Sequence, residues 1–194
     1  MIWREAMKLK SLIEAGEPER LATGFQFTEG PVWMADGYLL FSDIPANIMY
    51  KWTPESGAEV WREPSGNSNG LTRNSDDLLL ACEHGNRRVS RTNPAGTVET
   101  IAGAYQGKRL NSPNDVVVKS DGSVYFTDPP YGLTTLGPDE GQELDFHGVY
   151  RLSPDGQTLT LLADDYDCPN GLCFSPDESI LCGNDTARML RSRF

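Results

Sequence analysis

One unit occurs four times along this chain, and each copy places a Glu or an Asn where the chain enters a short strand. Each copy continues with a turn and an apolar run, as in Asp36-Gly37 before Tyr38-Leu39-Leu40-Phe41. The second residues of the four copies are separated by 40, 45 and 56 positions. The copies begin at Glu29-Gly30, Asn69-Gly70, Asn114-Asp115 and Asn170-Gly171. Repeats of about 40 to 45 residues built from short strands are typical of a β-propeller, in which each repeat is one four-stranded blade.

The repeats predict an all-β chain that forms a partial β-propeller over residues 21–194, with about three and a half blades. Residues 1–20 are expected to form an N-terminal arm or a short helix, and Leu21 to Phe27 a strand. The predicted blades lie at about residues 30–64, 69–103 and 114–164, with an incomplete blade at 170–194. Turn residues between the apolar runs set these boundaries.

The third repeat is longer than the others because it contains Pro129 to His147, a segment rich in Pro, Gly and acidic residues. Long loops on a regular scaffold often carry binding sites. The fourth repeat holds about two strands, and a propeller removes its exposed edges only by closing. We therefore expect a fragment of a longer gene product, or a chain that assembles with others.

The inner strands of all blades in a propeller start on the same face, so equivalent residues from different blades converge on the channel mouth. We expect Glu29, Asn69, Asn114 and Asn170, called the start residues below, to form part of a ring there. A second set of polar residues stands thirteen positions after the second residue of each copy. Its members, Asp43, Glu83, Asp128 and Asn184, are expected to be structural at the end of the second strand.

Composition excludes several classes of partner. The formal net charge of −11 argues against nucleic acid and anionic membranes, because phosphate contacts need clustered Lys and Arg. No stretch approaches the roughly 20 apolar residues of a membrane-spanning helix, and the first twenty residues do not resemble a secretory signal.

The four cysteines form no C-x-x-C pair, and we expect Cys82 and Cys182 to be reduced core thiols of a cytoplasmic protein. With only two histidines, one chain cannot build a three-His zinc site. The sequence also lacks a G-x-S-x-G elbow, a Gly-rich phosphate loop and an H-E-x-x-H motif.

Five motifs together make the chain resemble one known family over roughly residues 21–186. They are Phe27-Thr28-Glu29-Gly30-Pro31-Val32-Trp33, Cys82-Glu83-His84-Gly85-Asn86-Arg87-Arg88-Val89, Arg109-Leu110-Asn111-Ser112-Pro113-Asn114-Asp115-Val116, Phe126-Thr127-Asp128-Pro129-Pro130-Tyr131-Gly132 and Pro169-Asn170-Gly171-Leu172. These segments are similar to the gluconolactonase group of the SMP-30/gluconolactonase/luciferin-regenerating-enzyme-like family. The resemblance implies a six-bladed propeller that hydrolyses a sugar lactone and holds one divalent metal, usually Ca²⁺, at the channel mouth.

The resemblance also implies which residues bind the metal. The family ligands map onto Glu29, Asn170 and, directly or through water, Asn114. One carboxylate and two amides are a plausible partial shell for Ca²⁺, with Zn²⁺, Mn²⁺ or Mg²⁺ as alternatives. The remaining family ligand is an Asp from a later blade that this sequence does not contain, so we expect this chain to be impaired.

A metal at this place can polarise a lactone carbonyl and lower the pKa of the water that attacks it. The family usually assigns the general base to the Asp that is missing here. Among the residues present, Glu29, His84 and Asp128 are the candidate bases, while Arg109, Asn111 and Tyr131 are candidate contacts for sugar hydroxyls. Two alternatives stay open: a non-catalytic propeller that binds a partner or a small molecule through Pro129 to His147, or an enzyme of the paraoxonase or strictosidine-synthase type. The oligomeric state is left undecided.

Overall fold

The structure, a computed structural model, describes residues 18–135 and 141–187 and consists mainly of antiparallel sheets. Three sheets have four strands each, and within each sheet the strands pair in chain order. Blade 1 contains β1 (Thr28–Met34), β2 (Tyr38–Asp43), β3 (Ile48–Thr53) and β4 (Gly57–Arg62). Blade 2 contains β5 (Ser68–Arg73), β6 (Leu79–Glu83), β7 (Arg88–Thr92) and β8 (Val98–Ala102). Blade 3 contains β11 (Val116–Val118), β12 (Val124–Asp128), β13 (His147–Leu152) and β14 (Leu159–Tyr166).

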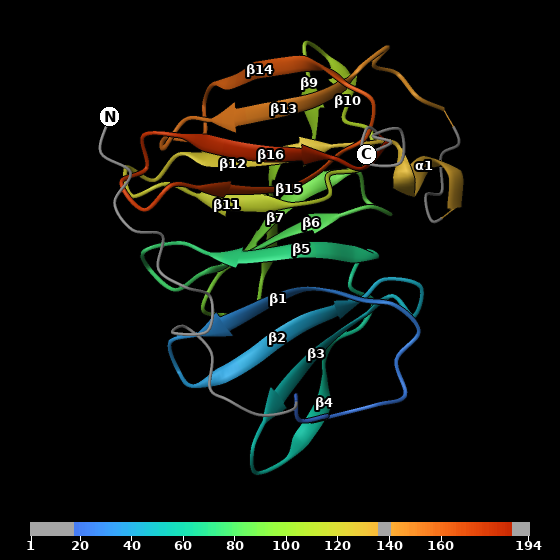
Figure 1. Cartoon of the computed structure of the whole chain (residues 1–194), viewed down its shortest axis with the longest axis vertical. Helices are drawn as coiled ribbons and strands as arrows, with labels where there is room; N and C mark the ends of the chain where they lie inside the picture. Colours follow the sequence, from blue (N-terminus) through green and yellow to red (C-terminus); the bar gives the residue numbers. More distant parts are fainter. Residues whose placement is uncertain (1–17, 136–140, 188–194) are drawn as a thin grey trace.

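The described part of a fourth blade consists of β15 (Pro169–Phe174) and β16 (Leu181–Asp185). Figure 1 shows the four inner strands, β1, β5, β11 and β15, lying side by side, with their starting ends on the side of the molecule where α1 (Tyr131–Thr135) lies. This arrangement confirms the predicted all-β propeller fold. The helix α1 is too short to span a membrane, and no described helix is long and apolar enough to do so.

The turn between the first and second strands of each blade contains one residue in the left-handed region. Its φ is 84° at Gly37, 60° at Asp77, 87° at Gly122 and 54° at Glu178. Asp77 and Glu178 use this position to reach back to the preceding blade. Asp77 accepts a hydrogen bond from the backbone N of Ala35, and Glu178 accepts bonds from the backbone N and the hydroxyl of Ser120. These acids therefore tie neighbouring blades together at the end opposite the start residues.

The core lies between successive blades, where apolar side chains alternate inward along each strand. One cluster, which includes Leu80, Val116, Phe126 and Tyr150, joins blades 2 and 3. A second cluster, which includes Leu40 and Leu71, joins blades 1 and 2.

Close contact between inner strands explains the glycines of the repeat. A side chain at Gly30 would collide with the backbone O of Asn69, and a Cβ at Gly70 would stand 2.6 Å from the backbone O of Asn114. The Gly70 N also donates to that oxygen of Asn114, at 2.8 Å. Glycine after a start residue thus allows the backbone of the next inner strand to lie in close contact.

Three aspartates at the ends of second strands cap the segment that leads into their own blade. Asp43 accepts from the backbone N of Gln26 and Phe27, Asp128 from that of Asn111, and Asp185 from those of Asp167 and Cys168. The prediction that Asn184 is the fourth member of this set was wrong, because Asp185 takes the place.

Glu83 holds the corresponding place in blade 2 with different partners. Its carboxylate is 1% exposed and bonds the guanidinium groups of Arg62 and Arg88, the hydroxyl of Ser90 and the amide of Asn86. Because Arg62 belongs to β4, Glu83 links blade 1 to blade 2.

Several other expectations need correction. Leu21 to Phe27 is not a strand, because it forms no backbone ladder with a described strand. Its bonds to Asp43 and Ile44 hold its end beside β2, and Phe25 packs its ring on Phe41 and Tyr50. Cys82 is buried as expected, but Cys182 is exposed on β16, the edge of the two-stranded sheet. The predicted arm at residues 1–20 lies largely outside the described residues.

The segment before the third blade and the long segment from Pro129 to His147 both contain regular structure. A small ribbon of β9 (Ala104–Tyr105) and β10 (Lys108–Arg109) precedes the blade. The long segment from Pro129 to His147 contains α1, and its later part is anchored to the blade, with Leu144 buried in the core. Arg87, which is buried, donates to the backbone O of Gly141 and of Leu110 and so fastens this segment to the ribbon region.

Candidate metal and substrate pocket

A pocket of about 230 Å³ lies where the inner strands of the four blades begin. Among the described residues, its lining comes from the beginnings of β1, β5 and β15 and from the two residues before β11: Glu29, Gly30, Pro31, Asn69, Gly70, Leu71, Asn114, Asp115, Asn170 and Gly171. The four start residues thus share one cavity, which is the geometry that the repeat predicts.

Three of these polar side chains have no partner in the described part of the chain. The carboxylate of Glu29 and the amides of Asn114 and Asn170 make no hydrogen bond or salt bridge with a described residue, although Asn114 is only 4% exposed. Glu29 is exposed and Asn170 is half-buried, and none of the polar side-chain atoms of these three residues is both buried and unpaired. Their oxygens are therefore accessible to a ligand that enters the pocket. Hard cations take carboxylate and amide oxygens, so these residues fit a cation of that type.

Hydrogen bonds between blades fix the backbone of the start residues. The hydroxyl of Thr127, at the end of β12, donates to the backbone O of Asn170 at 2.8 Å and accepts from the backbone N of Asp115 at 3.1 Å. The hydroxyl of Ser42, in blade 1, makes the corresponding donor contact to blade 2: it donates to the backbone O of Asn69 at 2.9 Å. The pocket is therefore held by a chain of contacts that runs from blade to blade.

Asp115 is a pocket residue that the sequence analysis did not single out. One carboxylate oxygen accepts from the backbone N of Leu172 in the fourth blade at 3.1 Å, and the other from the backbone N of Val116 at 2.9 Å. Burial raises the pKa of Asp115, these N–H donors oppose the rise, and the charge of Glu29 adds to it. The signal was present: Asp115 stands where the other three copies have Gly.

His84 lies next to the pocket lining but is almost completely enclosed, with 2% of its surface exposed. Its Nε2 is 3.3 Å from the side-chain nitrogen of Asn69. Burial lowers the pKa of His84 to about 4, so the ring is neutral near pH 7. The structure places His84 beside a start residue rather than in the cavity itself.

Two residues predicted to act in the pocket are buried in the core instead. Asp128 and Asn111 each have 0% exposure, and neither lines the pocket among the described residues. The Asn111 amide donates to the backbone O of Asp128 and of Phe146. Asn111 and Asp128 hold the segment before Asn114 against β12. Contact of either side chain with a sugar or with its attacking water stays a prediction.

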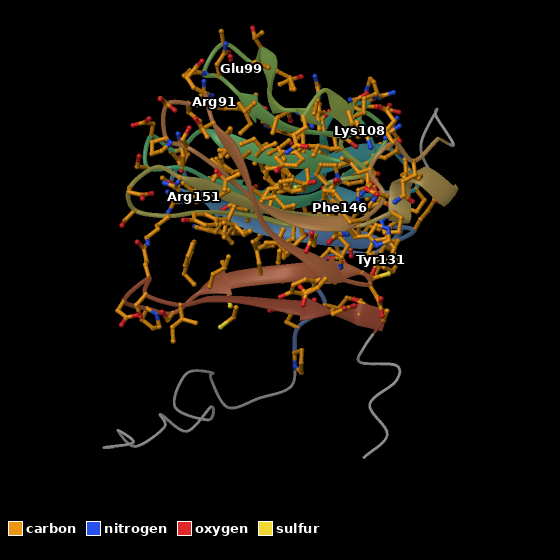
Figure 2. The ribbon with its side chains drawn as sticks, turned by 90° about the horizontal axis from the view of Figure 1, so that it is seen from above. Arg91, Glu99, Lys108, Tyr131, Phe146 and Arg151 are labelled. Carbon is orange, nitrogen blue, oxygen red and sulfur yellow. The ribbon has the colours of Figure 1, made fainter. Side chains whose placement is uncertain are left out.

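The two remaining candidates lie outside the lining of this pocket. Arg109 is in β10, where its backbone N donates to Glu143 at 2.7 Å. Tyr131 is half-buried at the start of α1, and Figure 2 shows it at the same end of the blades as Lys108 and Phe146. Contact of Tyr131 and Arg109 with a substrate thus stays a prediction.

Within the described residues, no group of three or more His, Cys, Asp or Glu side chains is arranged to hold a metal ion. The candidate set consists instead of one carboxylate with amides, and Asp115 adds a second carboxylate to the wall. This composition matters because amide oxygens are ligands for hard cations and are poor ligands for soft ones.

Comparison with known proteins adds independent information. Residues 27–194 match the family described as SMP-30/Gluconolactonase/LRE-like region. A gluconolactonase of Zymomonas mobilis is 40% identical over 197 residues, which cover 93% of this chain and 55% of that protein. The chain thus spans about half the length of the curated relatives that it matches.

Solved structures show the same relationship. A gluconolactonase from Xanthomonas campestris superimposes with a TM-score of 0.79 at 41% identity, covering 84% of this chain and 55% of that one. A calcium-binding regucalcin from Agrobacterium tumefaciens gives a TM-score of 0.62 at 21% identity, covering 85% of this chain and 52% of that one. The second likeness concerns the fold alone.

Proposed function

Because this chain belongs to the SMP-30/gluconolactonase/LRE-like family, we propose that it carries the greater part of the metal site of a sugar-lactone hydrolase. The observation that carries the proposal is the convergence of Glu29, Asn114 and Asn170 on one pocket, with no protein partner for their side chains among the described residues. These residues come from three different blades, so it is the fold that brings them together.

The pocket lining supports a divalent cation with oxygen ligands, and Ca²⁺ is the ion we propose. Its polar side chains carry only carboxylates and amides, and none of the described lining residues is Cys or His. Zn²⁺ prefers nitrogen and sulfur ligands, while Mg²⁺ and Mn²⁺ remain compatible with oxygen. When bound, such a cation polarises a carbonyl oxygen as a Lewis acid.

The residues of the chain itself would bind and orient both the ion and the lactone. Glu29 supplies negative charge at the exposed side of the pocket, and the enclosed Asn114 supplies an amide whose backbone is fixed to Gly70 and Thr127. Asp115 adds a carboxylate whose oxygens are held by Leu172 and Val116. We propose that a small sugar lactone is the substrate, because its hydroxyls can bond the amides that the ion leaves free.

We expect low activity from the 194-residue chain. Glu29 is exposed, so the pocket is open to water on the side of blade 1, and exposure weakens charge interactions with a substrate.

We also propose a cytoplasmic location. The four cysteines are free thiols in the structure, as is usual for proteins of a reducing compartment.

Two measurements on the purified chain test this function. Calorimetric titration with Ca²⁺ should show binding that Glu29→Gln weakens, while Glu59→Gln, the same change on an exposed residue of β4, should leave it unchanged. Acid release from glucono-1,5-lactone should exceed the spontaneous rate and depend on the added ion. Ca²⁺ binding without any lactone hydrolysis would favour the non-catalytic binding module, and absence of binding would overturn the proposed metal site.

A further inference from the structure

We propose that Asn69 supplies a further amide oxygen to the cation in this pocket, and that His84 is the positioning residue that turns that oxygen toward the ion. This inference rests on the proposed function above. It changes the role of His84 from a catalytic group to a support for a residue in the pocket wall.

The position of Asn69 is equivalent to that of the three proposed ligands. It stands at the start of the inner strand of blade 2, lines the same pocket and is 7% exposed. Its backbone O is held by the hydroxyl of Ser42, which is 2.8 Å from the hydroxyl of Ser68. The backbone is therefore fixed as firmly as that of Asn170.

The amide nitrogen of the Asn69 side chain is held by His84. This nitrogen, Nδ2, lies 3.3 Å from Nε2 of His84. In the tautomer of neutral His84 that carries its hydrogen on Nδ1, Nε2 accepts a hydrogen bond from this amide nitrogen, which leaves the amide oxygen for the pocket. That oxygen makes no hydrogen bond with any described residue. The amide therefore presents an acceptor, the atom that a hard cation binds.

Packing prevents His84 from turning away. The ring is 2% exposed, and α1 presses on it so closely that a Cβ at Gly132 would stand 2.7 Å from the Cβ of His84. Gly132 is itself held, because its backbone N donates to the hydroxyl of Ser112 at 2.9 Å. The helix in the long third-blade segment thus fixes His84, and His84 fixes Asn69.

Paired substitutions at Asn69 test the oxygen directly. Asn69→Leu keeps the approximate shape but removes the oxygen, whereas Asn69→Asp keeps an oxygen and adds charge. We expect Ca²⁺ to bind Asn69→Leu about tenfold more weakly, a loss of about 1.4 kcal/mol, and Asn69→Asp at least as tightly as the unmodified chain. A purely structural Asn69 would give the same Ca²⁺ dissociation constant in both variants, within about twofold, and that result would overturn the inference.

Substitution of His84 tests the positioning role. His84→Phe fills the space but offers no acceptor, and groups that orient metal ligands typically change metal affinity by about 10- to 100-fold. We expect His84→Phe to weaken Ca²⁺ binding at least fivefold and His84→Gln, which keeps an acceptor, to weaken it less. Thermal unfolding of each metal-free variant checks that it folds, and a variant that fails this check is replaced by Asn69→Ala or His84→Asn.

The outcomes separate this inference from the proposed function. If Glu29→Gln weakens Ca²⁺ binding and Asn69→Leu does not, the metal site stands and the role of Asn69 is wrong. If neither the unmodified chain nor any variant binds Ca²⁺ at millimolar concentration, both proposals fall.

Discussion

The carboxylates of Glu29 and Asp115 line one pocket, and the charge of Glu29 helps to raise the pKa of Asp115. The two residues come from blades 1 and 3, which are joined through blade 2. Two acids that share a small cavity repel each other, and a bound cation relieves that repulsion. The arrangement therefore favours a cation in the place that the repeat of the sequence indicates.

Neutralising Asp115 should weaken cation binding. Asp115→Asn removes the charge and keeps one of the two oxygens that accept the backbone N–H groups of Leu172 and Val116. We expect the Ca²⁺ dissociation constant to rise about fivefold to tenfold, since two unit charges about 4 Å apart interact by about 1 kcal/mol even in water. Calorimetric titration measures the change. An unaltered dissociation constant would show that the Asp115 charge does not act on the ion.

The hydroxyl of Thr127 should be important for joining blades 3 and 4. Thr127→Val removes the hydroxyl that bonds both Asp115 and Asn170 and leaves a partly buried N–H and C=O without that partner, so the free energy of unfolding should fall by about 1–3 kcal/mol. Thr127→Ser keeps the hydroxyl, so its free energy of unfolding should fall by less. Urea unfolding distinguishes them, and equal stabilities of the two variants would contradict the role assigned to the hydroxyl.

The buried carboxylate of Glu83 should contribute far more stability than an exposed ion pair. Glu83→Gln leaves Arg62 and Arg88 facing a neutral amide, and loss of one partner in a buried pair costs about 3–5 kcal/mol. Because these two arginines are partly exposed, we expect the lower end of that range. Glu99→Gln is the matched control, since its pair with Arg91 is exposed on both sides and should be worth less than about 1 kcal/mol. Urea unfolding measures both variants. Similar decreases in the free energy of unfolding for Glu83→Gln and Glu99→Gln would contradict the greater contribution assigned to Glu83.

Asp128 should make stability depend on pH. Burial raises its pKa to about 7, and the N–H donors of Asn111 and Ser112 and the charge of Arg87 offset this only in part. The unfolded chain loses this proton near pH 4, so the contribution of Asp128 to the free energy of unfolding is greatest below about pH 4 and falls as pH rises toward 7.

Asp128→Asn should remove this dependence. The variant should therefore gain stability relative to the unmodified chain as pH increases from 4.5 to 7, and the difference should level off above pH 7. Urea unfolding at pH 4.5, 6 and 8 gives the comparison. Parallel pH profiles for the two proteins would mean that Asp128 keeps an ordinary pKa.

The ring of start residues could be predicted from the sequence because strand order and period determine it. The four Glu or Asn residues recur with the blade, and a propeller brings equivalent positions together. The break of the Gly pattern at Asp115 was visible in the same repeat, although its bond to Leu172 could not be deduced without coordinates.

Other features depended on packing that periodicity does not encode. Asn111 precedes the inner strand of blade 3 and Asp128 ends the second strand, and sequence alone does not say whether polar residues at such positions face the pocket or the core. The error at Asn184 has a local cause, because the fourth hairpin pairs Leu172 with Gly183 whereas the second pairs Leu71 with Ala81. The additional residue in the fourth turn shifts the capping acid by one position, to Asp185.

An anomalous difference map from crystals soaked in Mn²⁺ would test the central claim most directly, because it locates the ion without reference to activity. We predict one peak in the pocket, about 2–2.5 Å from the side-chain oxygens of Glu29, Asn114 and Asn170. A peak bound elsewhere, or an empty pocket at millimolar Mn²⁺ with these side chains pointing apart, would contradict the account.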